Sequence, residues 1–312
     1  MKEEQKIKLL ERVASENTEI QKENFQTLLF ILNSIHYNRQ KTRDAFISER
    51  LHDSNLLLQK VMLNGYSMIK LISGIQIPNI EFKNFVIFND PITLNTILRS
   101  LLETYLTFHH FNSANLESEN EIRHKIWSYY GLYNRAKIKI NTPSLADRYK
   151  IVKENDAKDM EQLLSEIKNS EFFIKLHDDK KGSFLKDLQR NWKIKFNDKT
   201  YKQLSYQDLL NSIGLRIEFY ENQYNYLSWA THTTSILIYQ LRQMYDSNWD
   251  KLELHNCLIK GCSLIAMATV DLISNDADYS PSYELLNQEH KDFLNFYSYH
   301  FRSDNFTIDK VD

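Results

Sequence analysis

The sequence predicts an all-α protein: a multi-helix bundle with a long N-terminal helical hairpin and few if any strands. Its 312 residues include only 6 glycines and 4 prolines. Sheets and their tight turns need both residue types, whereas long helices need few of either. Hydrophobic residues make up 42% of the chain and aromatic residues 12%. This content is sufficient for a packed helical core.

Charge and hydropathy argue against several classes of protein. Lys and Arg total 39 and Asp and Glu total 41, which gives a net charge of −2. The chain therefore lacks the overall basic charge that is typical of nucleic-acid-binding proteins. The first residues contain no apolar signal core, and the longest apolar stretch, 262–273, is interrupted by Asp271. We therefore expect a cytoplasmic protein that does not enter a membrane.

One predicted helix, over 250–274, contains both cysteines of the chain, Cys257 and Cys262. Their spacing does not fit a zinc knuckle, and a disulfide within one helix would be strained. We predict two small buried side chains in a reducing compartment. Gly261, between them, is predicted to mark a close contact with another helix.

The predicted organisation is a single helical domain over residues 1–312. Residues 1–75 should form the N-terminal hairpin, residues 90–302 the core bundle, and residues 303–312 a loose tail. The first helix of the hairpin is mostly charged or polar over residues 3–24. This polar start is either a solvated face or a helix that pairs with another subunit, so a homo-oligomer through the N-terminal helices is one expectation.

An apolar helix is predicted over 92–112, and it should be central because it is hydrophobic nearly all round. Asp90 is suited to cap it, and Pro91 fits its first position. Arg99 and Glu103 lie inside this helix, four residues apart. At a helix edge such a pair contributes only a few tenths of a kcal/mol. Inside a core it is costly unless paired, and would indicate a site.

The stretch around which we organise the functional argument lies in a second predicted helix, over 215–244. It has polar-tipped side chains where a core helix would carry Leu or Ile. Spaced four residues apart, they are Tyr220, Tyr224, Ser228 and His232. The 92–112 helix carries its own polar stripe, Asn95, Arg99, Glu103 and His110. We predict that the two stripes face each other.

Residues 177–204 are predicted to form an irregular loop with a local basic patch. In an RNA-binding interpretation, Lys193 contacts phosphate and Trp192 stacks on a base. Otherwise this is an ordinary loop anchored by Trp192. Ser205 and Asp208 then predict the start of a short helix. The predicted binding residues are Asn95, Tyr224, Trp192 and Lys193.

Several of these motifs occur together in a bacterial all-helical family. They are Arg99-x-x-x-Glu103, Trp192, Ser205-x-x-Asp208, Gly214 and Leu227-Ser228-x-x-x-His232. Over residues 90–235 the chain resembles this family, which is known only as a domain of unknown function. The family often has Pro after the histidine, where this chain has Thr233. The resemblance implies an all-helical fold and a shared polar cluster, with no established activity.

The same family looks distantly similar to the HEPN helical nucleases and nucleotidyltransferase partners. Those nucleases carry a diagnostic Arg-x(4–6)-His spacing, which this chain lacks, because nine residues separate Arg99 from His109.

The residues suggest two functions. In the first, the chain is a metal-independent RNase or phosphotransfer-type enzyme of a defence or toxin system. His232 would act as general base or acid, Glu103 would orient it, and Arg99 would hold a phosphate. Ser228 is a further nucleophile candidate, although it lies in mid-helix. RNA would supply its own 2′-hydroxyl, so we predict no metal and no cofactor.

In the second, the protein is a non-enzymatic interaction module, and the polar cluster only fixes the register of the helices. Its partner would be a protein, or an RNA bound through residues 177–204. A metal site built from Glu103, His110 and His232 is conceivable, but these residues lack the spacing of a metal-binding motif.

Overall fold

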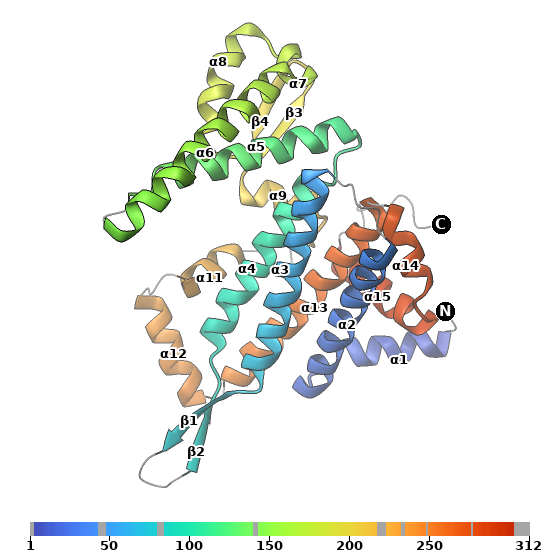
Figure 1. Cartoon of the computed structure of the whole chain (residues 1–312). Helices are drawn as coiled ribbons and strands as arrows, with labels where there is room; N and C mark the ends of the chain where they lie inside the picture. Colours follow the sequence, from blue (N-terminus) through green and yellow to red (C-terminus); the bar gives the residue numbers. More distant parts are fainter. Residues whose placement is uncertain are drawn as a thin grey trace. The chain divides into compact units, whose positions relative to one another are not determined.

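The computed structural model shows a helical protein with two small two-stranded sheets (Figure 1), which confirms the predicted fold class. It describes residues 3–42, 48–79, 84–139, 143–216, 223–231, 235–247, 249–275 and 277–302. The predicted loose tail, 303–312, lies outside the described residues. So do Tyr220 and His232 of the predicted polar stripe.

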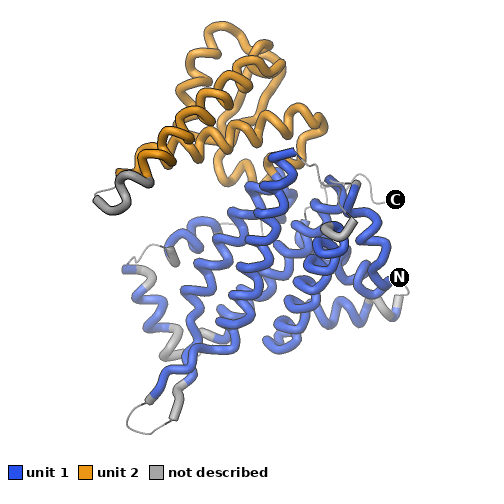
Figure 2. Tube along the Cα trace, in the orientation of Figure 1, with its two compact units in different colours: residues 1–109, 212–312 blue, residues 110–211 orange. Residues whose placement is uncertain are grey.

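The chain forms two compact units (Figure 2). Unit 1 combines residues 1–109 with residues 212–312, and unit 2 is the insertion between them, residues 110–211. The single domain predicted over the whole chain stays a prediction.

Unit 1 begins with the predicted N-terminal helices. They are α1 (Glu3–Val13), α2 (Thr18–Thr42) and α3 (Glu49–Ile72). The continuous first helix that we predicted is wrong, because the chain turns between α1 and α2. Asn17 accepts a hydrogen bond from the backbone N–H of Glu19 (2.9 Å). Gln21 donates to the carbonyls of Val13 (2.9 Å) and Ser15 (2.8 Å). These bonds satisfy the free polar groups of both helix ends.

An antiparallel hairpin of β1 (Ile75–Asn79) and β2 (Asn84–Phe88) follows α3, and Figure 1 shows its strands projecting from unit 1. The next helix, α4 (Pro91–His110), starts where the sequence predicted. Asp90 accepts a hydrogen bond from the backbone N–H of Thr93 (3.0 Å), as a capping residue does.

The core of unit 1 lies around α13 (Trp249–Asn275), which packs against α2 and α15 (Gln288–His300). The predicted close contact at Gly261 is confirmed, because a Cβ atom there would lie 2.8 Å from the Phe25 ring. By length and composition α13 alone among the described helices is apolar enough to cross a membrane. However, 83% of its apolar stretch is buried inside the protein, so the core of unit 1 accounts for its apolar character.

The remaining elements of unit 1 are shorter. They are α11 (Gln223–Thr231), α12 (Ser235–Ser247), the 3-10 helix η1 (Ala277–Tyr279) and α14 (Ser280–Glu284). Where a single helix was predicted over 215–244, the structure describes the two helices α11 and α12, which run in different directions in Figure 1.

Unit 2 is built on α5 (Glu117–Ala136) and α6 (Pro143–Asn169), which pack against each other. Its other elements are α7 (Glu171–Lys175), α8 (Asp178–Asp187), β3 (Ile194–Asn197), β4 (Thr200–Gln203) and α9 (Tyr206–Ser212).

The irregular loop predicted over 177–204 is wrong, because this stretch contains α8 and the β3–β4 hairpin. The hairpin turns at Asp198, which has a φ of 43° and so adopts a left-handed conformation that Asp tolerates. After the hairpin, Ser205 and Asp208 form the predicted capping pair. The N–H of Asp208 donates to Ser205 Oγ (3.0 Å), and the N–H of Ser205 donates to Asp208 Oδ2 (2.8 Å).

Candidate functional site

Arg99 and Glu103 of α4 meet Tyr224 of α11, and we call these three residues the Arg99 cluster. Arg99 Nε donates a hydrogen bond to Glu103 Oε1 (2.9 Å), and Arg99 Nη2 donates to the Tyr224 hydroxyl (3.2 Å). The same hydroxyl donates to Glu103 Oε1 (3.1 Å). The guanidinium also lies 5.1 Å from the centroid of the Tyr224 ring. Of the two predicted polar stripes, Arg99 and Glu103 of one therefore contact Tyr224 of the other.

The Arg99 cluster is only partly buried. The Arg99 side chain is 17% exposed and the Glu103 side chain 33%. Both hydrogen bonds to Glu103 fall on Oε1. Within the described part of the chain, the second carboxylate oxygen, Oε2, has no hydrogen-bond partner. The cluster thus combines a guanidinium held by hydrogen bonds with a carboxylate on a side chain that is one-third exposed.

The pKa values of Arg99 and Tyr224 are both raised in the Arg99 cluster. Burial lowers the pKa of Arg99, but the hydrogen bond and the charge of Glu103 outweigh it, so the pKa is raised. Burial raises the pKa of Tyr224, and the negative charge of Glu103 raises it further. At neutral pH the cluster therefore holds a guanidinium cation and a neutral phenol that donates to Glu103.

Asn95, one turn before Arg99, has a different environment. It is 2% exposed, and its amide nitrogen donates to Glu253 Oε1 of α13 (2.8 Å). Its amide oxygen accepts from Cys257 Sγ (3.4 Å). Glu253 also hydrogen-bonds Tyr226, whose pKa is raised by burial and by the Glu253 charge. Asn95 thus ties α4 to α13, and the binding role predicted for it stays a prediction.

The other predicted site residues are only partly described. Ser228 lies on α11 one turn after Tyr224 and is half-buried. His232 lies outside the described residues. Among those that are described, no three His, Cys, Asp or Glu side chains are grouped as the ligands of a metal ion would be.

Trp192 and Lys193 lie in unit 2. Trp192 is 8% exposed, and its ring packs edge-on against His110, with 5.4 Å between the centroids. Lys193 Nζ lies 4.5 Å from the centroid of the Tyr206 ring. A buried, edge-packed ring is typical of an anchoring tryptophan, whereas base stacking needs an open ring face. The binding role predicted for Trp192 and Lys193 stays a prediction.

Sequence reasoning missed a second polar cluster, which lies in the core of unit 1 and which we call the Asp271 cluster. Asp271 Oδ2 accepts from the Tyr105 hydroxyl (2.6 Å) and lies 2.9 Å from His109 Nδ1. Asp271 Oδ1 pairs with Arg302, which also donates to the Tyr105 hydroxyl (3.2 Å). The sequence does contain one signal: an aspartate inside the most apolar stretch of the chain needs partners.

The Asp271 carboxylate is ionised although it is buried. Burial alone would raise its pKa, but the charge of Arg302 and the hydrogen bonds from His109 and Tyr105 outweigh burial. They hold the pKa of Asp271 at about 2, below its ordinary value of 3.8. All four side chains are fully or almost fully buried. This sealed cluster is suited to fixing the arrangement of its helices and offers no opening to a substrate.

No curated protein and no solved structure matches this chain. Residues 89–249 match the family model DUF5677, a family of unknown function. The match contains α4, all of unit 2, α11 and all of α12, and so both helices of the Arg99 cluster. It confirms the expected membership of a family of unknown function, while the distant similarity to HEPN nucleases stays a prediction. The chain belongs to the DUF5677 family.

Proposed function

We propose that this protein is a metal-independent enzyme that acts on a phosphate ester, with RNA as its substrate and the Arg99 cluster as its active site. The observation that carries the proposal is the state of Arg99. Two hydrogen bonds fix its guanidinium, yet the cluster around it reaches solvent. A preorganised guanidinium of this kind binds phosphate and stabilises the charge that develops during its transfer.

The proposed reaction uses a group that RNA itself provides. The 2′-hydroxyl attacks the adjacent phosphorus, and its proton passes to His232 as general base. A new bond forms between phosphorus and the 2′-oxygen, while the bond from phosphorus to the 5′-oxygen breaks. The leaving 5′-oxygen takes a proton from water, and the hydroxide that remains takes back the proton held by His232. The products are a 2′,3′-cyclic phosphate and a 5′-hydroxyl, and no metal takes part.

The remaining residues have supporting roles in this proposal. Glu103 would orient His232, as the sequence predicts, and Tyr224 holds both Arg99 and Glu103 in place. Ser228 would accept the phosphoryl group only if the substrate were a nucleotide and the reaction a phosphotransfer. Lys193 would contact an RNA phosphate outside the active site, next to the buried Trp192. We place this activity in the cytoplasm, in a defence or toxin system of a bacterium.

A second function has one observation in its favour. The three hydrogen bonds of the Arg99 cluster form a closed ring in which each group satisfies another. Such a ring fixes helix register without any chemistry. The protein would then be a non-enzymatic module that binds a protein partner, and the Arg99 cluster would be structural.

The direct test is to incubate the whole chain with labelled RNA and labelled nucleotides in the presence of a chelator. His232→Ala should lower RNA cleavage by about 100-fold or more, as expected for the loss of a general base. His52→Ala changes an exposed histidine of α3 and is the matched control, which should keep full activity. The cleaved strands should end in 2′,3′-cyclic phosphate. All variants are compared at equal folded content.

The outcomes separate the two functions. Equal turnover by wild type and His232→Ala would rule out the catalytic role of His232. If no substrate is turned over and Arg99→Lys only lowers thermal stability, the cluster is structural and the enzyme proposal is wrong.

A further inference from the structure

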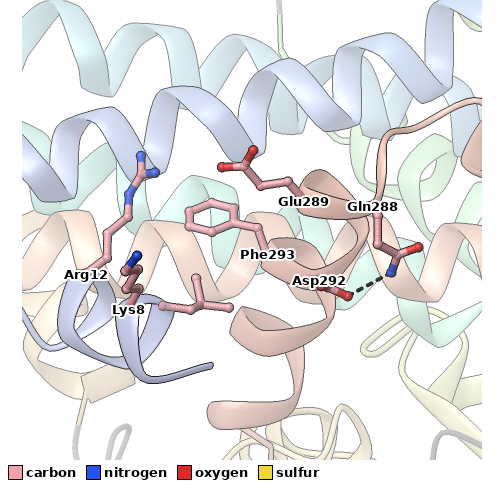
Figure 3. Close-up of a pocket in the computed structure, with 7 residues that line it drawn as sticks. Lys8, Arg12, Gln288, Glu289, Asp292 and Phe293 are labelled. Carbon is pink, nitrogen blue, oxygen red and sulfur yellow. Dashed lines mark hydrogen bonds between the residues drawn. The ribbon is translucent and has the colours of Figure 1, made fainter. Parts of the chain in front are cut away.

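A cavity of about 290 Å³ lies between α1 and α15 in unit 1 (Figure 3). None of its lining residues belongs to the Arg99 cluster. Its lining combines two cationic, two anionic, one amide and two apolar side chains: Lys8, Leu9, Arg12, Gln288, Glu289, Asp292 and Phe293. Since one water occupies about 30 Å³, the cavity has room for roughly ten. That is the size of a small metabolite.

Contacts with Asn24 and Phe293 hold the Arg12 side chain in place. Its Nε donates a hydrogen bond to Asn24 Oδ1 (2.5 Å), and its guanidinium carbon lies 5.2 Å from the centroid of the Phe293 ring. Asn24 is fully buried and is itself fixed by Tyr297 (3.0 Å) and Gln21 (3.2 Å). Within the described residues, the two terminal nitrogens of Arg12 make no hydrogen bond. They form a preorganised fork that suits a carboxylate.

The opposite wall of the cavity is acidic. Glu289 is exposed, and its carboxylate has no hydrogen-bond partner among the residues that the structure describes. Asp292, one turn further along α15, accepts a hydrogen bond from Gln288 (2.9 Å). Figure 3 shows Arg12 and Lys8 on the α1 side and both carboxylates on the α15 side, with the Phe293 ring between them.

We propose that this cavity binds a free α-amino acid with an apolar or aromatic side chain. The ligand carboxylate would pair with Arg12, assisted by Lys8. Its ammonium group would pair with Glu289 and Asp292. Its side chain would lie on the apolar surface of Leu9 and Phe293. Each of the three parts of such a ligand thus has a matching group in the cavity lining.

Other small ligands match the lining less well. A phosphate-rich anion would face two carboxylates, and a simple cation would face Arg12 and Lys8. A purely apolar ligand would displace water from four charged side chains and give them no partner. Only a ligand with one charge of each sign pairs with both walls.

The test is a calorimetric titration of the whole chain with L-phenylalanine and L-leucine. Two analogues each lack one charge: 2-phenylethylamine has no carboxylate, and 3-phenylpropionate has no ammonium group. We expect both amino acids to bind and each analogue to bind at least tenfold more weakly than phenylalanine. Equal binding of phenylalanine and either analogue would overturn the proposal, and so would the failure of both amino acids to bind.

Variants locate the site. Glu289→Gln removes one exposed charge and should weaken phenylalanine binding at least fivefold without lowering thermal stability. Glu11→Gln is the control, since it changes an exposed glutamate of α1 outside the cavity. Equal affinities of wild type and Glu289→Gln would place the ligand elsewhere. His232→Ala should leave amino-acid binding unchanged, so this site stands or falls independently of the proposed RNA cleavage.

Discussion

Nδ1 of His109 lies 2.9 Å from Oδ2 of Asp271, and both side chains are buried in unit 1. The contact joins the end of α4 to α13. Tyr105 donates to the same carboxylate oxygen, and Arg302 pairs with the other. These donors favour the ionised form of the Asp271 carboxylate, so the contacts stabilise the fold only while Asp271 is ionised.

Acid should destabilise unit 1 in a defined pH window. The folded-state pKa of Asp271, about 2, lies below its ordinary value of 3.8. Its stabilising effect is therefore complete above about pH 4 and is lost as the pH falls towards 2. The loss should amount to about 2 kcal/mol in the free energy of unfolding. Urea unfolding at a series of pH values measures it.

The control for this experiment is Asp271→Asn, which has no carboxylate to titrate at this position. Its unfolding free energy should vary less with pH over the same window. Identical pH profiles for wild type and variant would contradict the assigned role of Asp271.

Loss of the Asp271 charge should be costly at neutral pH as well. Asp271→Asn leaves the Arg302 guanidinium buried without a counter-charge, and we expect a loss of about 3–5 kcal/mol. Asp179→Asn removes a carboxylate from an exposed pair with Lys180 and should change stability by less than about 1 kcal/mol. Chemical unfolding of both variants gives the comparison. Similar effects at the two sites would disprove the buried pairing.

Tyr224→Phe should show whether the Arg99 cluster only stabilises the fold or also takes part in catalysis. It removes only the hydroxyl that joins Arg99 to Glu103, so the expected stability loss is about 1 kcal/mol. If the cluster is an active site, RNA cleavage should fall by a larger factor than this loss of folded protein explains. Tyr239→Phe, at an exposed position of α12, is the control. Unchanged turnover by Tyr224→Phe would argue against a positioning role.

Two glycines in helices should respond in opposite ways to a methyl group. At Gly261 a Cβ would lie 2.8 Å from the Phe25 ring and 3.2 Å from Met68, so Gly261→Ala should destabilise the protein by about 1–3 kcal/mol. At Gly131 of α5 a Cβ would meet nothing within 4 Å. Gly131→Ala should therefore stabilise its helix by about 0.5–1 kcal/mol. Thermal melts would show whether the two shifts have opposite signs.

Local signals in the sequence were sufficient for helix boundaries that depend on neighbouring residues. The cap at Asp90 and the Ser205–Asp208 pair both act within three residues, and both are present in the structure. The break after Val13 was not foreseen, because it depends on a side-chain amide, Gln21, that reaches back over the turn. The β3–β4 hairpin was missed because each of its strands is only four residues long.

The candidate sites show the same limit. Arg99 and Glu103 are one helical turn apart, so their pairing could be predicted. Tyr224 has a polar tip on a predicted helix, which indicated that it needs a polar partner. The Asp271 cluster was missed because its members come from α4, from α13 and, for Arg302, from the segment that follows α15. Arg302 is 31 residues from Asp271 in the chain, and no periodicity relates them. Only the packing of the helices brings such groups together.

The two thiols of α13 are natural probes for the opening of the core of unit 1. Cys257 and Cys262 are both fully buried and free, and burial raises the pKa of each. A reagent that reacts with cysteine thiolates can modify them only after α13 has separated from its neighbours. The rate of labelling in native buffer therefore reports how often unit 1 opens, without any denaturant.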